Sequence, residues 1–314
     1  FGLVSLMFLD TSINMAMQPF KMMVGDMVNE KQKGLAYSIQ SFLCNAGSLV
    51  GFLFPFIFTW IGISYIAPQG VVPDSVIYSF YIGAAILILC VIYTTVKVKE
   101  MPPAEYAEYH GITEEEEKEK INMVKLLVKA PKAFWTVGLV QFFCWFAFMF
   151  MWTYTNGSVA ANVFDAPTVE TVVNGISKIM LDTKSIQYQN AADWVGVLFA
   201  VQTIGSVLWA VCIPMFKNRK QIYSLSLILG GIGFISTYFV HNQYILFISF
   251  LLIGCAWAAM LALPFTILTN ALSGGHMGTY LGLFNGTICI PQIVAAALGG
   301  SIPVSYTHLT LPTT

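Results

Sequence analysis

The sequence predicts an all-α protein that crosses a lipid bilayer several times. Of its 314 residues, 57% are hydrophobic and 10% are charged, whereas soluble domains carry about a quarter charged residues. Apolar runs long enough to cross a hydrocarbon core about 30 Å thick recur along the chain. These runs are continuous, while the strands of a membrane barrel alternate polar and apolar positions over about 10 residues. Spanning helices are therefore expected.

Eight spans can be placed along the chain, and the loops between them differ in charge. The first, third and fifth loops hold twelve basic residues, while the other loops hold only Lys178 and Lys184. Because cytoplasmic loops carry an excess of Lys and Arg, the first span is expected to run from outside to inside. The predicted spans are about 1–28, 34–62, 74–98, 133–156, 192–216, 220–240, 243–272 and 277–302, and the predicted cytoplasmic loops are 29–33, 99–132, 217–219 and 273–276.

Three segments outside the spans differ from them in composition. The charged segment 99–132 divides three spans from five and is expected to be a solvated linker with a short amphipathic helix near "INMVKLLVKA". In the segment 157–191, "ETVVNGISKIMLDTK" is expected to form a short surface helix. The segment 303–314 is expected to be non-native, because "VSYTHLTLPTT" resembles the translation of a sequencing adapter. Since the chain starts in an apolar run without an initiator Met, a further N-terminal part is expected.

The sequence lacks the motifs of common enzyme active sites. It contains no HExxH, GxSxG, Walker A or CxxC pattern, so no enzyme activity, cofactor or metal site is expected. A net charge of −1 gives no reason to expect a nucleic-acid partner. The six cysteines lie singly in apolar runs and are expected to be unpaired core residues: Cys44, Cys90, Cys144, Cys212, Cys255 and Cys289.

The first span carries polar residues on one face. At about 100° per residue, Asp10, Asn14, Gln18 and Lys21 fall within an arc of about 80°, so this face is expected to look into the protein. Asp10 lies about 13 Å from the start of the span, near mid-depth. A carboxylate there costs about 2.5 to 3.5 kcal/mol on insertion scales and usually faces a bundle interior or a wet cavity.

Two interpretations of these charges stay open. A carboxylate at the depth of Asp10 can gain and lose a proton or bind a substrate, or it can simply hold helices together through a hydrogen bond. Lys21 and Asp26 lie near the cytoplasmic end of the span. They are either charges that reach the interface or gate charges between helices.

Further polar and aromatic residues lie inside the later spans. Gln141, Trp145 and Trp152 share one face of the fourth span, which suits either core packing or stacking on a sugar ring that is apolar on its faces and polar at its rim. Pro264 and Pro291 interrupt later spans and free backbone carbonyls, as in the broken helices of carriers. The last span adds two candidate cavity or helix-break residues, Asn285 and Gln292.

Glycines spaced four residues apart predict close helix packing. One such set lies in the second span and another in the last span. The residues are Gly47 and Gly51, and Gly278, Gly282 and Gly286.

Several of these stretches resemble the sucrose and glycoside:proton symporters of the major facilitator superfamily, which are related to the glycoside/pentoside/hexuronide carriers. The first span is similar to that family's fourth helix, of the form L-D-x-x-x-N-x-x-x-x-P-x-[RK]-x-x-x-x-D. The last two spans are similar to its tenth and eleventh helices, with P-[FY] and G-x-x-x-G-x-x-N-x-x-I-x-I-P-Q. The matching residues are Leu9, Asp10, Asn14, Pro19, Lys21 and Asp26 in the first pattern, and Pro264, Gly282, Asn285, Ile290, Pro291 and Gln292 in the others.

The resemblance implies a partial major facilitator fold, with helices four to eleven of an expected twelve. On that basis residues 1–98 form the C-terminal half of the first six-helix bundle, 99–132 form the central loop, and 133–302 form the second bundle without its last helix. The resemblance also implies a carrier in a bacterial inner membrane that imports a disaccharide or related glycoside with protons by alternating access. Its expected partners are the sugar, the proton and the lipid bilayer.

The resemblance also implies roles for individual residues. Asp10 is a candidate for proton coupling or sugar binding, and sucrose carriers often have an acidic residue where this chain has Trp152 and Thr153. Maltose or another glucoside therefore stays open beside sucrose. The alternatives are a carrier of another substrate or with sodium coupling, and a non-transporting receptor or scaffold that works through 99–132. The expected pathway residues are Asn14, Gln18, Gln141, Trp145, Trp152, Asn285 and Gln292, and the expected gate charges are Lys21 and Asp26.

Overall fold

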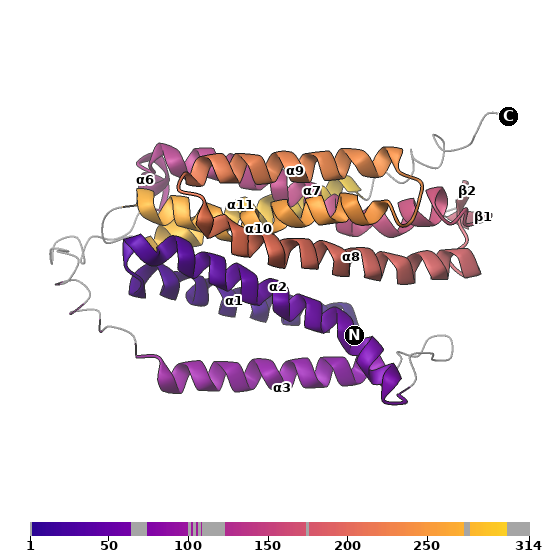
Figure 1. Ribbon diagram of the computed structural model, residues 1–314, viewed down its shortest axis with the longest axis horizontal. Coiled ribbons are helices and arrows are strands. Elements are labelled where there is room, and N and C mark those ends of the chain that lie inside the picture. The colour runs from indigo at the N-terminus through magenta and orange to yellow at the C-terminus, as the bar shows by residue number, and fades with distance from the viewer. Residues whose placement is uncertain are drawn as a thin grey trace.

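Long helices make up most of the protein, which confirms the predicted fold class (Figure 1). The computed structural model describes residues 2–63, 74–99, 102, 105, 108, 123–173, 176–272 and 277–299. The predicted loop 273–276 and the predicted non-native segment 303–314 lie outside the described residues. The eight predicted spans correspond to α1 (Gly2–Met27), α2 (Glu30–Trp60), α3 (Asp74–Lys97), α7 (Lys132–Asn162), α8 (Ile186–Cys212), α9 (Arg219–Phe239), α10 (Leu246–Ala271) and α11 (Met277–Gly299).

Several of these helices suit a bilayer, so the protein is a multi-pass membrane protein. Over the described residues, α3, α7, α8, α9, α10 and α11 are long and apolar enough to cross a membrane. α1 and α2, with 26 and 31 residues, have the length but are not among these six. α1 is less apolar because it carries polar residues such as Asp10 and Lys21 along its length.

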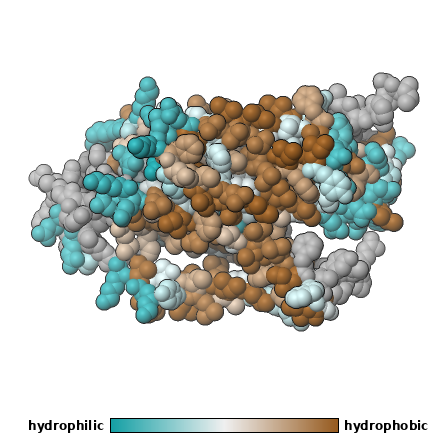
Figure 2. Space-filling view, in the orientation of Figure 1, coloured by the Kyte–Doolittle hydropathy of each residue, from teal (hydrophilic) through white to brown (hydrophobic). Residues whose placement is uncertain are grey.

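The helices run back and forth, so that the short connections gather at two ends. Figure 1 shows the turns after α1 and α8 at the same end as the short helix α6 (Met123–Val128), which lies in the segment predicted to be helical. A 3-10 turn, η1 (Ile213–Met215), follows α8 at this end. Figure 2 shows a hydrophobic belt across the middle of the molecule and hydrophilic residues at both ends. This distribution is that of a protein whose middle lies in hydrocarbon.

The segment between α7 and α8 is a β-hairpin, so the predicted surface helix is wrong. β1 (Thr168–Val173) pairs antiparallel with β2 (Ile176–Leu181), and Val173 faces Ile176. The two strands are rich in β-branched residues, which favour strands over helices. The sequence between them is Asn-Gly, the dipeptide most typical of two-residue hairpin turns.

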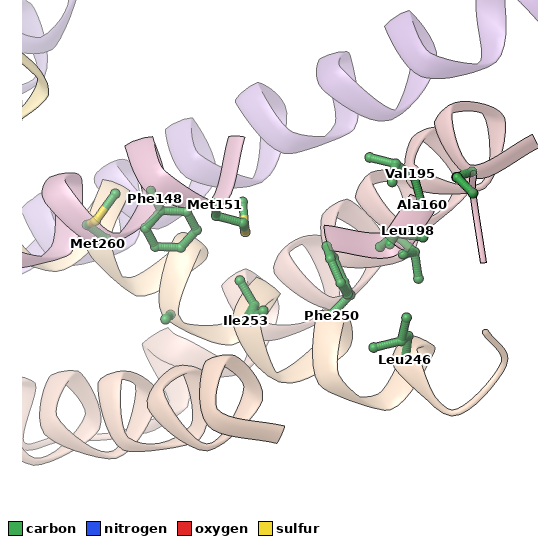
Figure 3. Packing of buried hydrophobic residues seen from close by; sticks show 13 residues of the cluster. Phe148, Met151, Ala160, Val195, Leu198, Leu246, Phe250, Ile253 and Met260 are labelled. Atoms are coloured by element: carbon green, nitrogen blue, oxygen red, sulfur yellow. The ribbon is translucent and has the colours of Figure 1, made fainter. Parts of the chain in front are cut away.

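The largest buried cluster joins α7, α8, α9 and α10. Figure 3 shows Phe148 and Met151 of α7 on the side of Ile253 of α10, and Leu198 of α8 beside Phe250 of α10. These side chains are 7% exposed or less. Because lipid is as apolar as the side chains, van der Waals packing rather than exclusion of water stabilises such a cluster.

The closest approaches between helices lie at other glycines than Gly47, Gly51, Gly282 and Gly286, the four predicted positions that the structure tests. In the described part of the chain, a Cβ added at Gly47, Gly51 or Gly282 would meet nothing within 4 Å, and one at Gly286 would meet only a residue of its own helix. Helix α10 instead approaches its neighbours at four other glycines. A Cβ at Gly205 or Gly233 would lie 2.7 Å from a backbone oxygen of α10, and one at Gly230 or Gly254 would come closer still, to Ala256 of α10 or Gln202 of α8.

The first three helices are less tightly packed than the last five. α2 packs on α8 and α10 and also contacts α1 and α3. Ser41 of α2 donates a hydrogen bond to the Ala258 carbonyl of α10 at 3.2 Å. α3 lies apart from the remaining helices in Figure 1, and 6% of its most apolar stretch is buried, against 61% in α10. The molecule is therefore organised as α1 to α3 on one side and α7 to α11 on the other, joined mainly through α2.

Candidate functional site

Three indole rings meet between α7 and α10. The ring centroids of Trp145 and Trp152 on α7 are 6.3 Å apart, and the Trp257 ring of α10 lies 5.5 Å from each of them. All three pairs have edge-to-face geometry, which the ring quadrupoles favour. The Phe148 ring lies beside the cluster, with its centroid 4.9 Å from that of Trp257. The predicted alignment of Trp145 and Trp152 is thus confirmed, and Trp257 completes the cluster from another helix.

Two buried polar atoms without partners lie in the indole cluster or one turn from it, and a third lies further along α11. Within the described residues, Trp145 Nε1, Gln141 Oε1 and Asn285 Oδ1 find no hydrogen-bond partner. Gln141 is one turn before Trp145 on α7. Asn285 lies on α11, at the level where Phe284 meets Phe134 of α7, two to three turns before Trp145. An unsatisfied buried polar atom costs about 1 to 3 kcal/mol of stability. Several such atoms in one protein therefore need a structural or functional explanation.

The donor group of Gln141 has a structural partner. Gln141 is fully buried, and its Nε2 donates to the Met260 carbonyl of α10 at 3.2 Å. Met260 lies four residues before Pro264, and a proline has no N–H to offer the carbonyl four residues earlier. The Gln141 amide therefore supplies the hydrogen bond that Pro264 removes. Its Oε1 is the part of the side chain that is left for a ligand.

The two predicted residues of the last helix lie on α11. Asn285 is partly buried, and its Nδ2 donates to Cys289 Sγ at 3.6 Å. Gln292 is also partly buried, next to the buried Pro291. These residues belong to the same half of the molecule as the indole cluster.

Asp10 lies on a different helix from the indole cluster. Its side chain is exposed on α1 and interacts with another group. The side chains of Asn14, Gln18 and Asp26 lie outside the described residues, so the predicted polar face of α1 is described only at Asp10 and Lys21. α1 contacts α2 and α11, whereas the indole cluster lies between α7 and α10.

Lys21 lies at a junction between the two sides of the molecule. It is 8% exposed, and its Nζ lies 4.7 Å from the centroid of the Phe265 ring of α10. The Tyr37 hydroxyl of α2 donates to the Lys21 carbonyl at 3.3 Å, and the Tyr37 ring stacks on Phe265 with centroids 6.1 Å apart. A charge predicted near one end of α1 is thus buried against a helix of the other side.

Sequence reasoning missed two aromatic residues of these sites. Trp257 and Phe265 both lie on α10, more than 100 positions after the residues that they contact. Periodicity within one helix gives no information on which helix faces it. A usable signal was present for Phe265, since it follows Pro264, where an interrupted helix indicates a special position.

Comparisons with known proteins identify the family. Residues 3–181 match the model of the Major Facilitator Superfamily. This span is more than half of the chain and runs from α1 through α7 to the hairpin. Comparison with curated proteins and with solved structures gives no match. The matched length, together with the apolar helices, shows that the chain belongs to the Major Facilitator Superfamily of membrane transporters.

Proposed function

We propose that the chain is part of a carrier that takes up a disaccharide or related glycoside, of maltose or sucrose type, together with protons across a bacterial inner membrane. One observation carries the proposal: three indole rings lie together beside buried polar atoms that have no partner among the described residues. The proposal takes the chain as helices four to eleven of a twelve-helix carrier, with 99–132 as the central loop.

The indole cluster has the chemistry that a sugar needs. The C–H faces of a pyranose ring are apolar and stack on indoles, while its hydroxyls both donate and accept hydrogen bonds. Trp145 Nε1 is a donor and Gln141 Oε1, one turn away, is an acceptor, both without partners among the described residues. Asn285 Oδ1 is a further unpartnered acceptor on α11. A site with an aromatic wall and a few convergent polar groups is typical of small-molecule binding. Trp152, which is 41% exposed, provides an open edge to the cluster.

Proton coupling is assigned to Asp10. A carboxylate at mid-depth in a spanning helix is costly unless it serves a pathway, and such residues mark proton relays in carriers. Binding of sugar between two halves that rock about the site would expose Asp10 alternately to each side. Asn14, Gln18 and Gln292 complete the proposed path, and Lys21 and Asp26 are its proposed gate charges.

The coupling role is tested in the complete carrier with Asp10→Asn. We expect concentrative, pH-dependent sugar uptake to be lost. Exchange of labelled for unlabelled sugar at equal concentrations on the two sides of the membrane should persist. Uptake that keeps its wild-type level and pH dependence in Asp10→Asn would refute this role.

The sugar role is tested by binding to the purified carrier. Replacing Trp152 by Phe keeps an aromatic face, whereas Trp152→Leu removes it. Since stacking contributes about 0.5 to 1.5 kcal/mol per aromatic pair, we expect affinity to fall about twofold to twelvefold further in the Leu variant. Equal affinities of the two variants for every glycoside tested would remove the indole cluster from the site.

Two other functions are separated by simple measurements. If sodium is the coupling ion or the substrate is not a sugar, adding sugar to lightly buffered cells leaves the medium without the alkalinisation that proton uptake causes. If the chain is a receptor or scaffold that works through 99–132, deleting residues within this segment abolishes function. Transport that survives the deletion supports the carrier.

A further inference from the structure

We infer that the end of the carrier with the basic loops is closed by a cation on an aromatic ring, Lys21 of α1 on Phe265 of α10. The inference deepens the gate role proposed for Lys21 and rests on it, but it needs neither the sugar nor the proton. The gate role follows from the family's mechanism, in which two halves take turns in opening to each side.

Three contacts converge on this junction. The Lys21 ammonium lies 4.7 Å from the Phe265 ring centroid, within the range of a cation–π interaction. The Tyr37 ring stacks on Phe265, with a centroid distance of 6.1 Å and an interplanar angle of 28°. The Tyr37 hydroxyl in turn donates to the Lys21 carbonyl at 3.3 Å. One ring of α10 is thereby held by residues of both α1 and α2.

Phe265 is anchored firmly on its own side of the junction. It is 2% exposed, and its ring meets Phe284 of α11 edge-to-face with centroids 5.8 Å apart. Phe284 is in turn packed on Phe134 of α7 at 5.8 Å. Phe265 is therefore packed against α11 and, through Phe284, against α7. The contact between Lys21 and Phe265 thus joins α1 to a group of three packed helices.

The junction lies at the end where the basic loops gather. Lys21 is within two turns of the end of α1, and Tyr37 is two turns into α2. A second basic contact lies nearby, since the Arg219 guanidinium of α9 lies against Gly34 of α2. Both contacts join the α1–α3 side to the α7–α11 side at the predicted cytoplasmic end. They are positioned to open and close together when the halves rock.

The chemistry suits a closure that must open in every cycle. Breaking a buried ion pair by removing one partner is strongly unfavourable, because it leaves a charge buried alone. When the ammonium leaves the neutral ring it can be hydrated, and the ring stays buried among apolar residues without an unpaired charge. A desolvated cation–π contact shifts an equilibrium about 30-fold, which is about 2 kcal/mol at 1.4 kcal/mol per factor of ten. That is enough to bias the closed state without locking it.

The test measures opening through a reporter cysteine in the complete carrier. Ser38→Cys places a thiol beside Tyr37, at a position that is 2% exposed and whose hydroxyl donates to the Gly34 carbonyl of α2, in a background without natural cysteines. A membrane-impermeant maleimide is applied from the cytoplasmic side in inside-out vesicles. We expect slow labelling with Lys21 and Phe265 in place, up to about 30-fold faster labelling in Lys21→Met or Phe265→Leu, and slow labelling in Lys21→Arg.

A fluorinated phenylalanine at position 265 separates charge from packing. Trifluorophenylalanine keeps nearly the same ring volume but weakens the negative face that attracts a cation. We expect it to speed labelling as Phe265→Leu does, and to have no effect in the Lys21→Met background. The inference is overturned if fluorination leaves labelling unchanged, or if Lys21→Met labels at the wild-type rate. Because fluorination preserves the fold even if Phe265→Leu fails to accumulate, the decision does not depend on that variant.

Discussion

Gln141 shows how one buried amide serves a helix to which it does not belong. Its Nε2 donates to the Met260 carbonyl, which Pro264 deprives of its normal partner. We predict that Gln141→Leu destabilises the protein by about 1 to 3 kcal/mol, because the carbonyl is then buried without a donor. Unfolding in mixed micelles measures this loss.

Pro264→Ala provides the matched control, because alanine returns a backbone N–H to Met260. In that background Gln141→Leu should cost at least about 1 kcal/mol less than in the native sequence. An equal cost in both backgrounds would show that Gln141 acts through packing and not through the freed carbonyl.

The position of a residue on its own helix was predictable from the sequence. Its contacts with a second helix were not. The helical period aligned Gln141, Trp145 and Trp152, and the structure keeps them on one face. Trp257 and the role of Gln141 at Pro264 depend on how α7 packs on α10, which periodicity does not encode. The roles of Asp10, Asn14, Gln18 and Gln292 in transport stay predictions.

At the scale of elements, two adjacent glycines of α9 give a direct comparison. A Cβ at Gly230 would collide with the Ala256 Cβ of α10, whereas one at Gly231 would meet nothing within 4 Å among the described residues. We predict that Gly230→Ala costs about 1 to 3 kcal/mol, because α9 must move away from α10. Gly231→Ala should be neutral or stabilising by up to about 1 kcal/mol, because alanine is the better helix former.

Stability of both variants is measured by the same unfolding assay in micelles. Since the two positions are neighbours on one helix, differences in insertion or expression affect both alike. Equal stabilities would mean that α9 is free to shift and that the close approach at Gly230 does not limit packing.

The elements show why local sequence rules succeed for spans and fail elsewhere. A span needs only about 20 apolar residues, and every predicted span is a helix. Glycines spaced four apart at Gly47 and Gly51 were equally visible, but close packing depends on a partner helix and falls at Gly205, Gly230, Gly233 and Gly254 instead. The hairpin was missed because the predicted surface helix ignored its β-branched residues and its Asn-Gly turn.

At the scale of the whole molecule, the charge pattern predicts which end faces the cytoplasm. Lys184 and Lys217 are both exposed and flank the two ends of α8. We predict that Lys184→Cys is labelled only from outside the cell and Lys217→Cys only from the cytoplasm. The measurement uses an impermeant maleimide on right-side-out and inside-out vesicles, in a background without the natural cysteines. The reverse pattern, or labelling of both from one side, would contradict the predicted orientation.

The overall architecture was the most predictable level, because composition and loop charge average over many residues. The eight helices, their alternating direction and the superfamily follow from the sequence and are confirmed by the structure and the family match. How tightly the helices pack was not predictable, since α3 and α10 are similarly apolar and yet differ in burial from 6% to 61%. The bilayer accepts both, because lipid replaces protein neighbours at no large cost.

The indole cluster also gives the protein an optical property. Three of its seven tryptophans lie with ring centroids within 6.3 Å, close enough for their electronic transitions to couple. A ligand that enters beside Trp152 must change the polarity around these rings, and it must alter their relative orientation if they move. Near-ultraviolet circular dichroism and tryptophan emission should therefore report occupancy of this place directly, without any attached dye.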